Sequence, residues 1–278
     1  MEINIPLQAG FSLKIATQSS PGTGYPTTRL QKGLILTYEG KEMIEEGVGF
    51  GVPVLKHGTQ TIFAGDLELN EQQSDSTHEV TAHYIMNLEE KFARAGSEYV
   101  ENQMVYTIKN FLAAIIRQYP FFRRLLTSIS NIVRRLLKWE TIYTEVGSRT
   151  KVKVKYKIDR QAGNIYIEVD TGGLFKDGVT QVAVMNEQGA GHFDQYQDSN
   201  GICLSGKEVG CWDEVTAEGA SLIDSLHRVA FSLKQVPGAK LYRGREQIES
   251  RLAWSGFGYL IPPTIERFSY ALKIEKLP

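Results

Sequence analysis

Short runs of alternating apolar and polar residues fill the first 88 positions of the chain. The clearest runs are FSLKIAT, GLILTYEG, TIFAGDLEL and HEVTAHYIM, and residues typical of turns lie between them. Alternation with a period of two is the pattern of a strand that has one buried face and one face in water. Glycine, proline and asparagine between such runs indicate antiparallel connections. The first third of the chain therefore predicts a series of antiparallel strands.

The same alternation returns after position 140. In KVKVKYKID, residues 151–159, the apolar side chains point one way and four lysines point the other. RQAGN then predicts a turn into IYIEV, which completes a hairpin, and RFSYALKIEKL near the C-terminus predicts a final strand. Residues 187–219 are rich in glycine and predict an irregular region, whereas residues 220–234 fit a helix or a strand equally well.

Between these two regions the apolar positions take the spacing of a helix. Ser97 is a suitable N-cap, and the apolar stripe continues through FFRRLLTSISNIVRRLLKW, residues 121–139. Pro120 removes a backbone donor and crowds the preceding turn, so it interrupts this stretch. The pattern predicts two packed helices at about 97–138.

Strands, two helices and further strands together predict a mainly β protein. We expect one β-rich domain over residues 1–278, built as a large antiparallel two-sheet sandwich with the two-helix insertion at about 97–138. At this length the pattern is similar to the supersandwiches of galactose mutarotases and lyases, which is a likeness of fold alone.

The net charge of −1 conceals a basic segment. Residues 102–139 contain seven basic residues and no acid, which leaves 24 basic and 32 acidic residues in the rest of the chain. The predicted second helix carries the candidate anion-binding residues Arg123, Arg124, Arg134, Arg135 and Lys138. Its apolar face must be buried away from water, against its own sheet, a partner or an anionic membrane surface. One functional hypothesis is therefore a noncatalytic module that docks on such a membrane or partner.

Composition limits the other partners and the location. The acidic residues in the rest of the chain would repel the phosphates of a nucleic acid, so we expect no nucleic-acid binding. No apolar run approaches the roughly 20 residues that a membrane-spanning helix needs. The N-terminal sequence MEINIPLQAGFSLKI lacks the features of a signal peptide, and we expect a cytoplasmic protein.

Candidate acid and base residues occur in two places. His192 and Asp194 lie two positions apart in GAGHFDQYQD, so an extended segment would present both on one side. Such a pair can act as a general base or bind a metal, but a polar surface turn has the same composition. His227, three residues after Asp224, forms a second cluster of this kind. Asp66 and Glu68 form a pair of carboxylates of the type that glycosidic chemistry uses.

Two stretches combine glycine with aromatic residues. They are GVGFGVPVL, residues 47–55, and WSGFGYLIPP, residues 254–263. Glycine in a strand permits a bulge or a close approach of backbone, and rings beside it can stack on a ligand or fill the core. The candidate ligand-binding rings are Phe50, Trp254, Phe257 and Tyr259. The leading hypothesis is a protein that binds or processes a carbohydrate-like ligand in an aromatic and acidic cleft between the sheets.

The two cysteines, Cys203 and Cys211, bracket LSGKEVG. A hairpin with its tip at residues 206–208 would set them opposite each other within reach of a disulfide, although free thiols are the usual state in a cytoplasmic protein. His78 and His83 lie on opposite faces of a predicted strand and make a poor metal pair. We expect neither a metal nor a cofactor.

Overall fold

The computed structural model describes residues 1–17, 29–45, 47–73, 77–94, 139–210, 212–248, 252–262 and 264–278. The chain divides into two compact units, Met1–Leu88 with Glu145–Pro278, and Glu89–Thr144. The predicted helices at 97–138 lie outside the described residues, as do Arg123, Arg124, Arg134, Arg135 and Lys138. Docking through them remains a prediction. The described residues contain no α-helix, so the two-helix detail finds no support there.

The predicted mainly β fold is confirmed, and its strands form two antiparallel sheets. The four-stranded sheet consists of β1 (Glu2–Pro6), β2 (Phe11–Ala16), β3 (Ile35–Tyr38) and β4 (Lys41–Glu42). The large sheet contains, in chain order, β5 (Phe50–His57), β6 (Gln60–Gln73), β7 (Thr77–Arg94), β8 (Trp139–Asp159), β9 (Asn164–Asp170), β10 (Gln181–Gln188), β11 (Gln195–Asp198), β12 (Cys203–Ser205), β13 (Asp213–Glu214), β14 (Gly219–Asp224), β15 (Val229–Lys234), β16 (Lys240–Ile248), β17 (Leu252–Ile261) and β18 (Arg267–Lys276).

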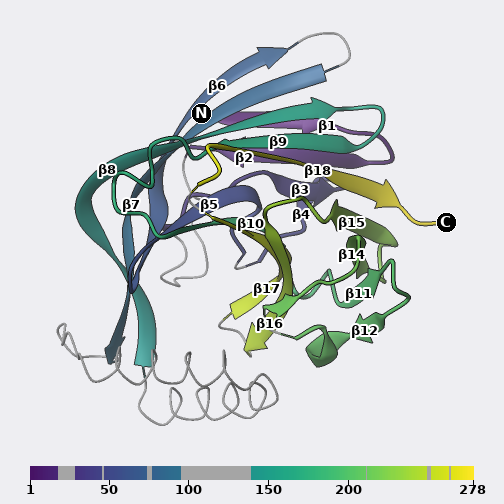
Figure 1. Cartoon of the computed structure of the whole chain (residues 1–278). Coiled ribbons are helices and arrows are strands. Elements are labelled where there is room, and N and C mark those ends of the chain that lie inside the picture. The colour runs from purple at the N-terminus through teal and green to yellow at the C-terminus, as the bar shows by residue number, and fades with distance from the viewer. Residues whose placement is uncertain are drawn as a thin grey trace. The chain divides into compact units, whose positions relative to one another are not determined.

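Within the unit formed by Met1–Leu88 and Glu145–Pro278, strands of the large sheet face each other across a core. Its spatial order is β12-β11-β14-β15-β18-β9-β8-β7-β6-β5-β10-β17-β16-β13, so five strands separate β18 from β10. The hydroxyl of Tyr270 on β18 nevertheless donates to Oδ1 of Asn186 on β10 over 2.8 Å. Strands far apart in the sheet therefore face each other, and together with the small sheet they make a layered β-sandwich (Figure 1).

Buried tyrosines connect the two sides of this core. The hydroxyls of Tyr84 on β7 and Tyr156 on β8 lie 2.7 Å apart, and that of Tyr156 also donates to the carbonyl of Phe50 on β5 over 3.2 Å. Burial raises the pKa of both phenols. These bonds satisfy the polar ends of rings that are otherwise packed among apolar side chains.

The small sheet is connected to the large one at the end of β10. The side chain of Gln188 accepts a hydrogen bond from the backbone N–H of Leu36 and donates one to the carbonyl of Leu34. Gln188 is fully buried, so these two bonds satisfy an amide that would otherwise be costly to bury.

Strict alternation predicted the regular strands correctly. Within β8 the four apolar side chains of KVKVKYKID are fully buried and the lysines lie on the outer face. The turn after Asp159 and the hairpin to β9 are confirmed, as is the final strand β18. Residues 220–234 form the hairpin β14–β15, which settles the choice between helix and strand.

The predicted hairpin between the cysteines is wrong. Cys203 begins β12, which pairs with β11 and sets Cys203 opposite Gln197. Residues Gly206–Val209 form a 3₁₀ helix, η3, in place of the hairpin tip. Cys203 is exposed, whereas Cys211 lies outside the described residues, so their pairing stays a prediction. None of the helices in the described ranges has the length and apolarity to span a bilayer.

Candidate functional site

The outer face of β10, β17 and β16, turned away from the core tyrosines, gathers acids, tryptophans and glycines. Strand pairing sets Glu187 on β10 opposite Gly256 on β17, and Gly256 opposite Gly244 on β16. Glu246 on β16 is opposite Trp254. Directly opposed residues share a face, and so do residues two apart in one strand. Glu187, Glu246 and Trp254 therefore lie on one face of three adjacent strands.

Glycines on this face make room for a stacked pair of tryptophans. The rings of Trp212 and Trp254 lie 4.7 Å apart between centroids and 19° from parallel. A Cβ atom on Gly258 would come within 2.9 Å of the Trp212 ring, and one on Gly244 within 2.7 Å of the Trp254 ring. A larger residue at either glycine would displace a ring. We name this set, Glu187, Trp212, Glu246 and Trp254 with its glycines, the tryptophan face.

Trp212 adopts an unusual backbone conformation to reach this position. Its φ angle is 58°, in the left-handed region that a bulky residue rarely occupies. Such conformations cost roughly 1–3 kcal/mol and are concentrated at functional sites. Trp254 is 6% exposed, whereas Trp212 is half-buried, so Trp212 is the ring of the pair that solvent or a ligand can reach.

Glu187 is the acid of this face whose protonation is most altered. The pKa of Glu187 is raised from 4.5 to about 7, mainly by burial and also by the nearby carboxylate of Glu246. The N–H of Val48, which donates to Oε2 over 3.1 Å, opposes this rise. A Cβ on Gly256 would come within 2.8 Å of Cγ of Glu187, so glycine is needed for the close approach. An acid with this pKa can donate or accept a proton near neutral pH.

The other predicted ligand-binding rings lie in the core. Phe50, Phe257 and Tyr259 are each 0% exposed and pack against further rings: Phe50 and Phe257 contact Phe231, at 5.1 and 5.8 Å between centroids. The space between the sheets at these rings is filled, so the aromatic and acidic combination occurs on the outer face of β17. Of the four rings, Trp254 alone belongs to the tryptophan face.

The paired carboxylates Asp66 and Glu68 both lie on the outside of β6. Oδ2 of Asp66 accepts from Nδ2 of Asn87 over 2.8 Å, and Glu68 forms an ion pair with Lys151 at 2.8 Å. The side chains of Glu68 and Lys151 are about half exposed. The pairing with Lys151 lowers the pKa of Glu68. These residues form a solvated network typical of a strand surface.

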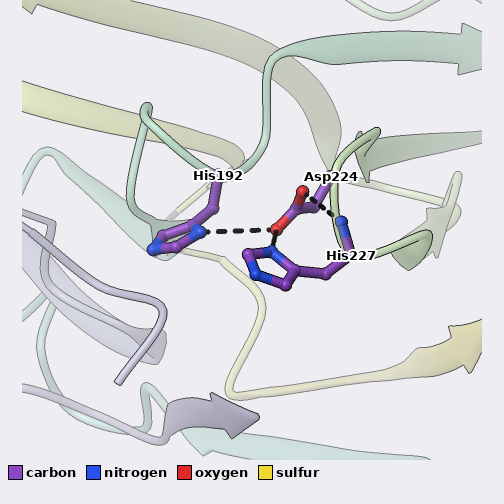
Figure 2. A group of neighbouring side chains, drawn as sticks. All are labelled: His192, Asp224 and His227. Carbon is purple, nitrogen blue, oxygen red and sulfur yellow. Dashed lines mark hydrogen bonds and ion pairs between the residues drawn. The ribbon is translucent and has the colours of Figure 1, made fainter. Parts of the chain in front are cut away.

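His192 and Asp194 do not form the predicted pair with each other. Residues 189–192 make a turn closed by the N–H of His192 on the carbonyl of Gly189, so the two side chains diverge from the arrangement of an extended segment. Nδ1 of His192 lies 3.4 Å from Oδ2 of Asp224, whereas Asp194 accepts a hydrogen bond from Oγ of Ser225 over 3.1 Å. Figure 2 shows that the same Asp224 oxygen also contacts His227. The two histidine clusters of the sequence are therefore one cluster.

Sequence reasoning missed Glu187 and Trp212. The run QVAVMNEQ carries a usable signal for the first, because Ala183, Met185 and Glu187 share one face by period two. Nothing local marks Trp212, because its neighbours come from β16 and β17.

Comparisons with known proteins give a fold and no family. No family model matches the sequence, and no curated protein matches it. Among solved structures, α-N-acetylgalactosaminidase NagBb from Bifidobacterium bifidum, in its GalNAc complex, is similar with a TM-score of 0.50 and 9% identity over 99% of this chain. The chain spans only 36% of that protein.

Two further structures are more distant. A galactose mutarotase-like protein from Lactobacillus casei ATCC 334 gives a TM-score of 0.41 at 11% identity, with 99% of each chain covered. An α-mannosidase from Enterococcus faecalis V583 gives 0.44 at 9% identity, over 100% of this chain and 29% of that one. The likeness to the α-N-acetylgalactosaminidase, at 9% identity, indicates a shared fold alone.

Proposed function

We propose that the protein binds a carbohydrate-like ligand on the tryptophan face and that Glu187 is its protonatable group. The observation that carries the proposal is the Trp212–Trp254 stack beside a buried glutamate whose pKa is about 7. The ligand class comes from the sugar-directed α-N-acetylgalactosaminidase that shares the fold, and the location comes from this chain's own residues.

The chemistry of the face suits a sugar. A sugar ring has apolar C–H faces that pack on aromatic rings and hydroxyl groups that bond to carboxylates. Trp212 supplies the ring, and its position is fixed by stacking on Trp254 and by its close fit to Gly258. Glu187 and Glu246 supply two carboxyl groups on the same face, of which Glu187 is fixed by the N–H of Val48.

Glu187 gives the face a means of moving protons. Near neutral pH its carboxyl group is present in both protonation states because its pKa is about 7. The protonated carboxyl group can transfer its proton to a sugar oxygen, and the carboxylate can take a proton from a hydroxyl group. Those are the two steps that acid and base catalysis at a sugar oxygen requires.

Trp212→Ala is expected to weaken sugar binding about 5- to 30-fold, because loss of a stacking ring removes about 1–2 kcal/mol of contact energy. A panel of mono- and oligosaccharides screened by tryptophan fluorescence identifies a ligand, and calorimetry then compares its affinity for the wild type and the variant. Tyr166→Ala is the matched control, because Tyr166 is an aromatic residue on β9 that is 51% exposed. It should leave the affinity unchanged. Absence of binding across the panel, or equal affinities for wild type and Trp212→Ala, contradicts the proposal.

A further inference from the structure

The cluster of His192, Asp224 and His227 lies where three separate parts of the fold meet. His192 follows β10, Asp224 ends β14, and His227 belongs to the turn between β14 and β15 (Figure 2). Tyr38 at the end of β3 places its ring 5.6 Å from the His227 imidazole. None of these side chains belongs to the tryptophan face, so the cluster is independent of the proposed sugar site.

Asp224 presents a single oxygen to both imidazoles. Its Oδ1 accepts the backbone N–H groups of Leu226 and His227, each over 3.0 Å, which fixes the carboxylate. Its Oδ2 lies 2.7 Å from Nδ1 of His227 and 3.4 Å from Nδ1 of His192. The two donor nitrogens and this oxygen therefore converge on one small volume, and one ligand atom from each residue lies within 4.8 Å of the others.

The charge balance of the cluster favours a cation. The Asp224 side chain is 1% exposed, and a buried carboxylate requires a nearby positive charge. Nζ of Lys276 donates to the carbonyl of His227 and to the hydroxyl of Tyr38. A metal ion bound by Asp224 and the two imidazoles would supply that charge.

We propose that His192, Asp224 and His227 bind a first-row divalent transition metal such as Zn²⁺. Two imidazoles and a carboxylate are ligands that Zn²⁺ favours, at bond lengths of about 2.0–2.2 Å. Ligand atoms around such an ion are about 3.0–3.4 Å apart for angles of about 90–110°, and the separations of 2.7 and 3.4 Å from Oδ2 lie close to that range. The proton on Nδ1 of His227 leaves as the metal takes its place on that nitrogen.

Two other features fit a metal site. The histidine side chains are 29% and 32% exposed, so an ion can reach them from solvent. Further hydrogen bonds position the ligands: backbone N–H groups donate to Asp224, and Nζ of Lys276 donates to the carbonyl of His227 over 2.8 Å. Three protein ligands leave one or more positions free for water or a small anionic ligand. The proposed site runs against the expectation of no metal, which rested on sequence spacing alone.

Calorimetric titration of the full chain with Zn²⁺, after treatment with a chelator, tests the proposal. We expect one ion per chain and an affinity reduced at least about 100-fold by His192→Ala or His227→Ala, since even loss of an outer partner costs about 10–100-fold. Asp224→Asn keeps an acceptor for the two backbone N–H groups and removes the anionic ligand, so it should lose binding while the turn is retained. Co²⁺ titration, followed by its visible absorption, reports nitrogen coordination directly.

His57→Ala and Cys203→Ser are the controls, because each removes a metal-binding side chain elsewhere in the chain. Both should bind Zn²⁺ as the wild type does. Should His227→Ala fail to fold, as judged by circular dichroism, His192→Ala keeps the test valid because His192 lies partly exposed in a turn. The proposal fails if Zn²⁺ does not bind below roughly millimolar concentration, or if binding is the same in His192→Ala and wild type.

Discussion

Glu187→Gln is expected to raise the free energy of unfolding by about 3 kcal/mol at pH 8 and to change it little at pH 4. The reason is the displacement of the pKa of Glu187 from 4.5 to about 7 in the folded state, at about 1.4 kcal/mol for each pH step of one. Below pH 4.5 the carboxyl is protonated in both folded and unfolded chains, so the folded state bears no cost. Between pH 4.5 and 7 the unfolded chain releases its proton more readily, and the wild-type stability therefore falls as pH rises. Glutamine stays neutral and escapes this loss.

Equilibrium unfolding in urea at several pH values between 4 and 8 measures this effect. Glutamine also retains an oxygen that accepts the N–H of Val48, so the substitution isolates the charge. Glu208→Gln, at an exposed position of η3, serves as the control and should change stability by less than about 0.5 kcal/mol at any pH. An effect of Glu187→Gln that is the same at pH 4 and pH 8 would show that the charge of Glu187 is not the cause.

A glutamate that costs the folded protein several kilocalories at alkaline pH is informative about function. Selection for stability alone would replace it by a neutral residue, as the expected behaviour of Glu187→Gln illustrates. Trp212, with its left-handed backbone, is a second local cost on the same face. Two destabilising features on one surface are typical of a binding site, because such a site is selected for ligand binding and not for the stability of the unliganded fold.

The regular strands could be predicted because period two depends only on which side of a strand is buried. Residues 151–159 show this clearly, since every apolar position in the run is buried. The hairpin at 220–234 was ambiguous because its apolar spacing suits both structures. Asp224 stabilises the turn of this hairpin by accepting two backbone N–H groups. The spacing of apolar residues does not reveal this interaction.

Both candidate sites depend on long-range strand order, which no local pattern contains. Glu187 meets Gly256 only because β17 returns to pair with β10. His192 meets Asp224 only because the sheet brings the end of β14 to the turn after β10. The sequence singles out His192 and Trp254 as candidates, but it does not identify their neighbours. Treating 189–194 as extended assigned His192 the wrong carboxylate, Asp194 in place of Asp224.

Gly51→Ala is expected to lower the free energy of unfolding by about 3 kcal/mol, through a backbone cost of about 1–2 kcal/mol and an overpacking cost of about 1–3 kcal/mol. Gly51 has a φ angle of 76° at the bulge where β5 pairs with β10, and its added Cβ would come within 2.6 Å of the Tyr156 ring. That ring has little freedom to move, because its hydroxyl lies 2.7 Å from that of Tyr84 and it is fully buried.

Gly40→Ala provides a matched control for Gly51→Ala, because Gly40 has almost the same φ angle, 78°, and no atom within 4 Å of an added Cβ. It should lose only the backbone share, about 1 kcal/mol. The difference between the two variants, measured by urea unfolding followed by circular dichroism, is then the energy with which the Tyr156 ring resists displacement. Equal losses in the two variants would mean that the core at Tyr156 yields freely. In that case the φ angle alone, without the close contact to Tyr156, would explain why glycine is needed at position 51.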